Sequence, residues 1–172
     1  FIIAVDTAIR PLLQAGIVPD LFITVDPVKD LFLFKQEGVS KVPMVLSMNV
    51  KRGVSKIHTG HHFYILNGGD YMANIMERYQ KKVISTNGGG SVATDAFTLL
   101  RKMGFDTIIL VGQDLAYPGN RSHAKAAYDD MIDKNKGNYF EVEDIHGNQV
   151  LTRMDMNHYR RWFEDQIAAD AT

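Results

Sequence analysis

Three consecutive glycines between an apolar run and a helical pattern are the first sign of chemistry in this sequence. They occupy positions 88–90 within the stretch STNGGGSVATDAF, residues 85–97. Glycines let backbone N–H groups approach an anionic oxygen, Ser91 can cap the following helix, and the helix N-terminus adds partial positive charge. We therefore expect the turn at 87–91 to hold a phosphate or carboxylate. A tight strand-to-helix turn with a serine cap and no ligand is the alternative interpretation.

A second polar segment, GQDLAYPGNRSHA at residues 112–124, is too long to be a simple connection. Asp114 and Tyr117 could orient a ligand, and Arg121 could pair with a phosphate. His123 could act as a general base, because the pKa of an unperturbed histidine lies near neutrality. A solvated surface loop with an incidental histidine is the alternative.

His158, at the start of the last expected helix, is a second candidate base. Gly88-x-Gly90-x-x-Ala93 formally fits the dinucleotide fingerprint, with Asp114 about 20 positions later. The fingerprint needs this carboxylate at the end of the next strand, but Asp114 lies beyond the end of that strand. The G-K-[ST] motif of a P-loop is also absent, so we do not favour a dinucleotide site. No H-E-x-x-H or His-x-His pattern occurs, and we predict no metal site.

Apolar runs of strand length alternate with helical patterns along the first 111 residues. This alternation predicts an α/β fold with a mostly parallel sheet and helices on both faces. The expected strands are Phe1–Val5, Leu21–Val25, Met44–Ser47, Phe63–Leu66, Val83–Ser85 and Thr107–Val111, and the expected helices are Arg10–Ala15, Pro27–Glu37, Tyr71–Tyr79 and Val92–Met103.

The pattern changes towards the C-terminus. We expect a helix over Ala124–Lys134, a hairpin over 139–153 with its turn at His146–Asn148, and a closing helix over Asn157–Ala168. We expect a single domain over 1–172, with a core at 1–123 and the C-terminal elements at 124–172. Because the chain opens on a strand without a methionine or cap, we expect a fragment of a longer protein, truncated at both ends.

The loops after the strands would meet at one rim, because ligands of open α/β sheets bind beyond the carboxyl ends of the strands. The histidines named above, His123 and His158, are the candidate catalytic bases. The candidate binding residues are Asp6, Thr7, Asp26, Asn49, Asn67, Asn87, Gly88, Gly89, Gly90, Ser91, Gln113, Asp114 and Arg121.

Composition narrows the class of protein. The net charge is −1, and lysines and arginines are scattered, which argues against a nucleic-acid or membrane partner. No apolar run reaches the roughly 20 residues of a membrane helix, and we expect no signal peptide. The absence of cysteine excludes disulfides and thiolate metal sites and is consistent with the cytoplasmic location that we expect.

Three stretches together resemble the motility accessory factor proteins, a bacterial family associated with flagellin glycosylation. They are DTAIRPLLQAGIVPDLFITVDP, NGGGSVATDAFTLLRKMGFDTIILVGQDLAY and RSHA, and YRRWFEDQIA is similar to the family's closing helix. The elements Asp6-Thr7-Ala8, Pro19-Asp20 and Asp26-Pro27 resemble a wider superfamily that includes the archaeal 6-hydroxymethylpterin diphosphokinases.

The resemblance implies a Rossmann-like domain that transfers a nonulosonic acid, such as pseudaminic or legionaminic acid, from its CMP-activated form to Ser or Thr of flagellin. The chain also resembles the bacterial sialyltransferases, whose TSG turn and GxDxY loop would match 87–91 and 112–117. By that likeness Ser91 would touch the donor, Asn49 the nucleotide, and Tyr117 the phosphate leaving group as a third catalytic residue. The likeness implies a histidine base and no cofactor.

Two other functions remain open. A pyrophosphate transferase like the pterin enzymes would need ATP and Mg²⁺, with Asp26, Asp70 or Asp114 holding the metal. A non-catalytic module that binds a nucleotide or flagellin is the third hypothesis.

Overall fold

The computed structural model describes residues 1–67, 74–76, 78–79, 84–125, 127 and 131–170. The chain divides into two compact units, unit 1 over Phe1–Asp106 and unit 2 over Thr107–Thr172. Among the described residues, no helix combines the length and apolarity needed to cross a membrane.

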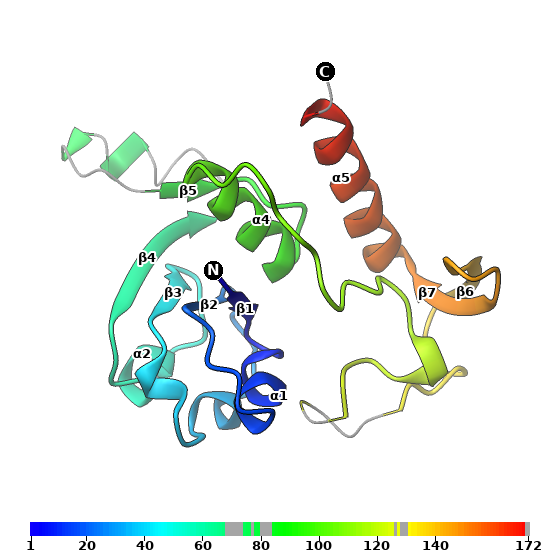
Figure 1. The fold of residues 1–172 in the computed structure, drawn as a ribbon, viewed down its shortest axis with the longest axis horizontal. Coiled ribbons are helices and arrows are strands. Elements are labelled where there is room, and N and C mark those ends of the chain that lie inside the picture. The colour runs from blue at the N-terminus through cyan, green and yellow to red at the C-terminus, as the bar shows by residue number, and fades with distance from the viewer. Residues whose placement is uncertain (68–73, 77, 80–83, 126, 128–130, 171–172) are drawn as a thin grey trace. The chain divides into compact units, whose positions relative to one another are not determined.

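Unit 1 contains a parallel sheet of five strands in the order β1-β2-β3-β4-β5 (Figure 1). The pairs Thr24↔Leu46, Ser47↔Ile65 and Asn67↔Thr86 show that neighbouring strands end almost level with one another. Their carboxyl ends therefore lie along one edge of the sheet. The strands are β1 (Ile3–Val5), β2 (Leu21–Thr24), β3 (Met44–Ser47), β4 (His62–Asn67) and β5 (Ile84–Thr86).

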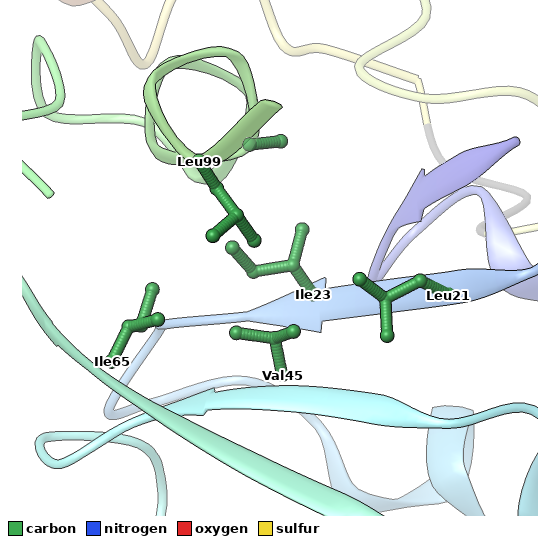
Figure 2. Close-up of a cluster of buried hydrophobic side chains, with 6 residues drawn as sticks. Leu21, Ile23, Val45, Ile65 and Leu99 are labelled. Atoms are coloured by element: carbon green, nitrogen blue, oxygen red, sulfur yellow. The ribbon is translucent and has the colours of Figure 1, made fainter. Parts of the chain in front are cut away.

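Helix α4 (Val92–Lys102) covers one face of this sheet. Alternate residues of the strands, Ile23 and Val45 among them, point to the face where Leu99 of α4 packs (Figure 2). The helix contacts β1, β2 and β5, so it carries the chain back across the sheet. The ring of Phe105, just after the helix, then packs 5.2 Å from the ring of Phe1.

Short helical segments cover the opposite face. The ring of Phe22 on β2 lies 6.3 Å from that of Phe34 and 5.5 Å from that of His58. Both β2 and β3 are buried along their whole length, as expected for strands covered on two faces. The predicted α/β class, a parallel sheet with helices on both faces, is confirmed. These segments are α1 (Ile9–Gln14), η1 (Leu31–Phe34), η2 (Val39–Lys41) and α2 (Val54–Ile57).

Two expected elements of the first 111 residues are wrong. Instead of a helix over Pro27–Glu37, the chain forms only the 3₁₀ turn η1. The Asp26 carboxylate accepts the Val28 N–H (2.7 Å), but Asp30 is extended with ψ 127°, and this conformation interrupts the expected helix before η1 begins. Thr107–Val111 is not a strand, and Ile109 is 81% exposed. Apolar β-branched residues indicate a preference for burial, but a strand also needs a neighbour to pair with.

Within its described residues, unit 2 contains an antiparallel hairpin, a 3₁₀ turn and the closing helix. The expected hairpin and closing helix are confirmed, and the Asp144 side chain fixes the hairpin turn by accepting the N–H groups of His146 and Asn148, both at 2.8 Å. The expected helix over Ala124–Lys134 is wrong for its described residues, none of which is helical. The elements are η3 (Pro118–Asn120), β6 (Tyr139–Glu143), β7 (Gln149–Arg153) and α5 (Met154–Asp170).

The helix expected over Tyr71–Tyr79 lies partly outside the described residues. Within the part that is described, residues 74–76 and 78 are helical.

Candidate functional site

A row of polar side chains follows the carboxyl edge of the sheet in unit 1. Each strand contributes one such residue, either its last residue or the next one. Because each strand ends within two residues of the end of its neighbour, these groups lie in neighbouring positions and define what we call the polar row. Its members are Asp6, Thr24, Ser47, Asn67 and Thr86.

Asp6 forms the first end of the polar row and is completely buried. Its carboxylate accepts the Thr24 hydroxyl (3.1 Å) and the Thr7 N–H (2.8 Å), and the Lys29 ammonium lies 3.3 Å away. Burial raises the pKa of Asp6, and the charge of Lys29 is the strongest influence in the opposite direction. The predicted site residues Asp6 and Thr7 therefore lie in a closely hydrogen-bonded corner.

Lys29 links this corner to the loop after β2. Its ammonium lies 3.9 Å from the Asp26 carboxylate as well as 3.3 Å from Asp6. Its side chain is only 15% exposed, so it is a largely buried cation between two carboxylates. Both acids are among the residues predicted from the sequence, whereas the lysine is not. The position of Lys29 three residues after Asp26 is the feature of the sequence that could have indicated this ion pair.

The middle of the polar row organises the loop after β3. The Ser47 hydroxyl donates to Oδ1 of Asn67, and the Asn49 N–H donates to the Ser47 oxygen (3.0 Å). The side chain of Asn49 is exposed. The backbone of the predicted nucleotide contact is thus fixed while its amide group stays accessible to a ligand.

The glycine turn stands at the other end of the polar row, between β5 and α4. Gly90 has φ +103°, a conformation that favours glycine. At Gly88, a Cβ would lie 2.7 Å from Oδ1 of Asp95, so no side chain fits. The Ser91 oxygen accepts the Thr94 N–H (3.2 Å) and the Thr94 hydroxyl accepts the Ser91 N–H (3.1 Å), which forms a capping box. The serine cap is confirmed, and anion binding stays a prediction.

Asp95 is a member of this site that the sequence analysis missed. It is 4% exposed, and burial raises its pKa although Thr86, Gly88 and Asn67 lower it by hydrogen bonding. Oδ1 of Asp95 has no hydrogen-bond partner among the described residues. A sequence signal existed, because Asp95 stands four positions before Leu99 on the apolar face of the helix.

The structure thus brings many of the predicted binding residues to one edge of unit 1. The triple-glycine turn and Asn49 lie on the same edge, as the sequence analysis expected. The predicted residues at this edge are Asp6, Thr7, Asp26, Asn49, Asn67, Asn87, Gly88, Gly89, Gly90 and Ser91.

The remaining predicted residues belong to unit 2. The loop that carries Tyr117 is fixed to β7, since the Tyr117 N–H donates to the Leu151 carbonyl (2.8 Å) and the Thr152 hydroxyl donates to the Leu115 carbonyl (2.9 Å). Tyr117 is 4% exposed and packs edge-on against the ring of Tyr139. Burial raises its pKa, so the phenol is neutral near pH 7. Its contact with a leaving group stays a prediction. The other predicted residues here are Gln113, Asp114, Arg121, His123 and His158.

Both candidate bases are exposed in unit 2. Nδ1 of His123 lies 3.0 Å from the Ser122 hydroxyl. His158 lies in the first half of α5, where its ring is close to that of Tyr159. Solvent reaches both imidazoles, and their catalytic role stays a prediction.

Comparison with known families identifies the fold's relatives. Residues 1–120 match the family model described as 6-hydroxymethylpterin diphosphokinase MptE-like. The chain belongs to this MptE-like family. The match spans all of unit 1 and the start of unit 2, and it confirms the superfamily that the sequence resemblance indicated.

Two similar proteins extend this finding. The MAf glycosyltransferase from Magnetospirillum magneticum AMB-1 matches 92% of this chain with a TM-score of 0.66 at 20% identity, which shows a common fold. The matched part is 24% of that protein, so the chain spans about a quarter of its length. An uncharacterized protein of Treponema pallidum (strain Nichols) is 51% identical over 39 residues, which are 23% of this chain and 10% of that protein.

Proposed function

We propose that this MptE-like chain is part of a glycosyltransferase that transfers a nonulosonic acid, of the pseudaminic or legionaminic type, from a CMP-sugar to Ser or Thr of flagellin. The observation that carries the proposal is the polar row of unit 1, which ends in a glycine turn at the N-terminus of α4. The common fold with a MAf glycosyltransferase supports it. The expected cytoplasmic location and the absence of a cofactor belong to the same proposal.

The donor would bind along the carboxyl edge of unit 1. The glycine turn and the first N–H groups of α4 suit the phosphate of CMP, because a helix N-terminus favours an anion. The exposed amide of Asn49 suits the donors and acceptors of a nucleoside. Together these two segments would bind the charged and the neutral part of one ligand.

The transfer itself needs a base and a stabilised leaving group. His123 or His158 would take the proton of the acceptor hydroxyl as its oxygen bonds to the anomeric carbon of the sugar. The bond between that carbon and the phosphate oxygen breaks, and CMP leaves with the electron pair. Backbone N–H groups at the glycine turn would stabilise the negative charge that develops on the phosphate.

Calorimetry of the protein with CMP, CDP, ATP and NAD, in EDTA and again in Mg²⁺, tests the donor class. We expect saturable CMP binding in EDTA. Asn49→Ala should weaken it up to about tenfold, the loss of one hydrogen bond. Ser55→Ala, an exposed change on α2, is the matched control and should leave the affinity unchanged. No binding of CMP, or equal binding by the Asn49 variant, would contradict the proposed site.

The second candidate function is an Mg²⁺-dependent pyrophosphokinase. The family match favours it, and Asp26, one of the carboxylates considered as a metal ligand, lies at the carboxyl edge of unit 1. Of the metal ligands that the sequence analysis considered, Asp114 lies in unit 2 and Asp70 lies outside the described residues. ATP binding that requires Mg²⁺, together with no binding of CMP, would favour this function over glycosyl transfer.

A further inference from the structure

Asp95 is a buried carboxyl group on the apolar side of α4, an unusual place for an acid. It is 4% exposed, and Oδ1 has no hydrogen-bond partner among the described residues. Burying a carboxylate is costly unless it is well hydrogen-bonded, and each unpaired buried oxygen in a folded protein needs an explanation. Packing alone would be served better by an apolar residue at this position.

The backbone of the glycine turn lies directly against this carboxyl group. A Cβ on Gly88 would lie 2.7 Å from Oδ1, 2.8 Å from Cγ and 2.9 Å from the backbone nitrogen of Asp95. No space for a side chain remains between the turn and Asp95. Glycine at position 88 is therefore required by Asp95 before any ligand is considered.

The carboxyl group is also joined to the strands of the sheet. Thr86 and Asn67, at the ends of β5 and β4, are close enough to the carboxyl group to lower its pKa against the effect of burial. Oδ1 of Asn67 in turn accepts the Ser47 hydroxyl, and the Ser47 oxygen accepts the Asn49 N–H at 3.0 Å. A row of neighbouring polar groups thus leads from the loop after β3, through the polar row, to Asp95 and the glycine turn.

We infer that Asp95 is a positioning residue, which fixes the Asn49 loop and the glycine turn relative to each other so that both can contact one ligand. It acts through Asn67 and Gly88 and does not itself touch the ligand. The inference rests on the proposed ligand site at the carboxyl edge of unit 1. It adds to that site a residue that neither the family match nor the fold comparison assigns.

Backbone amide resonances test the inference without a ligand. In ¹H–¹⁵N spectra of the protein, Asp95→Asn should shift the amides of Asn49 and Gly88. Asp106→Asn, the same change at an exposed site at the end of unit 1, is the matched control and should shift neither. A residue that only stabilised the helix would leave the Asn49 amide, on another strand's loop, unchanged. An unshifted Asn49 amide in Asp95→Asn overturns the inference.

Affinity for CMP is the second measurement. Asp95→Ala should weaken CMP binding about tenfold, and Asp95→Asn, which keeps one acceptor oxygen, should recover part of the loss. Gly88→Ala disturbs the same contact from the other side and should also weaken binding. Unchanged affinity in a folded Asp95→Ala protein overturns the inference.

The two proposals can fail separately. If the wild-type protein binds no CMP, the proposed function fails. The Asn49 amide in Asp95→Asn then still decides the positioning role, with a shift supporting it and no shift overturning it.

Discussion

Replacing Lys29 with methionine removes the cation that lies 3.3 Å from the buried Asp6 carboxylate. Removing one partner of a buried ion pair costs about 3–5 kcal/mol, because the other charge stays buried without compensation. Asp6 is completely buried, but Lys29 keeps 15% exposure, so we expect the lower end, about 3 kcal/mol at pH 7. A solvent-exposed pair would cost at most about 1 kcal/mol.

The loss of stability in Lys29→Met should depend on pH, because it comes from the negative charge of the buried Asp6. Burial already raises the pKa of Asp6 above its value near 3.8 in the unfolded chain, and without Lys29 the pKa should rise further. A carboxyl group whose pKa is raised by folding binds its proton more tightly in the folded state. The contribution of Asp6 to the free energy of unfolding is therefore complete below pH 3.8 and is lost as the pH rises through the pKa of Asp6 in the folded state. The deficit of Lys29→Met should shrink between pH 7 and pH 4.

Urea unfolding followed by far-UV circular dichroism is the suitable assay. Fluorescence of Trp162 is not, because this tryptophan belongs to unit 2. The double variant Asp6→Asn/Lys29→Met removes both charges and should be more stable than Lys29→Met alone. A cost below about 1 kcal/mol for Lys29→Met, the same at pH 7 and pH 4, would refute the reasoning.

Three further predictions concern the stability of unit 1, each measured by the same urea titration. Burial lowers the pKa of His58 below 6.5, its value in the unfolded chain, and Nδ1 of His58 lies 2.8 Å from Nε2 of His62. The neutral His58 therefore stabilises the fold above pH 6.5, and this stabilisation is lost as the pH falls through the pKa of the folded state. The urea midpoint should fall between pH 6.5 and 5, and a His58→Gln variant with the same slope would contradict this. Ser91→Ala removes the capping box of α4 and should cost about 1 kcal/mol, whereas the exposed Ser55→Ala should cost less than about 0.5 kcal/mol. Leu99→Ala in the core beneath α4 should cost about 2–5 kcal/mol, and a smaller loss would show that the helix does not pack as described.

Much of unit 1 could be predicted from the sequence because its strands are short, apolar and separated by polar loops. Met44–Ser47 was predicted with the bounds that the structure shows, and Val92–Met103 differs by one residue from α4. Parallel strands place their carboxyl ends together, so the common edge of the predicted binding residues followed from strand order alone. The spacing of apolar residues was therefore sufficient to predict the order of the strands and the edge at which the loops meet.

The predictions from the sequence fail where a contact between residues far apart in the chain determines the local structure. Residues 107–111 have the composition of a buried strand but do not pair with one among the described residues. The importance of Lys29 depends on Asp6, 23 positions earlier, and no local pattern contains that contact. His58, which lies in a weakly patterned basic segment of the sequence, is buried against Phe22, and its Nε2 lies 2.9 Å from the Val42 carbonyl oxygen.

The central claim is that the carboxyl edge of unit 1 binds the nucleotide of a CMP-sugar, and a titration of the ¹⁵N-labelled protein with CMP in EDTA tests it most directly. The account predicts saturable shifts of the amides of Asn49, Asn67 and residues 88–91, with those of His61 and His62, at the opposite edge of the sheet, unchanged. Shifts confined to the opposite edge, or no saturable shift at all, would contradict it.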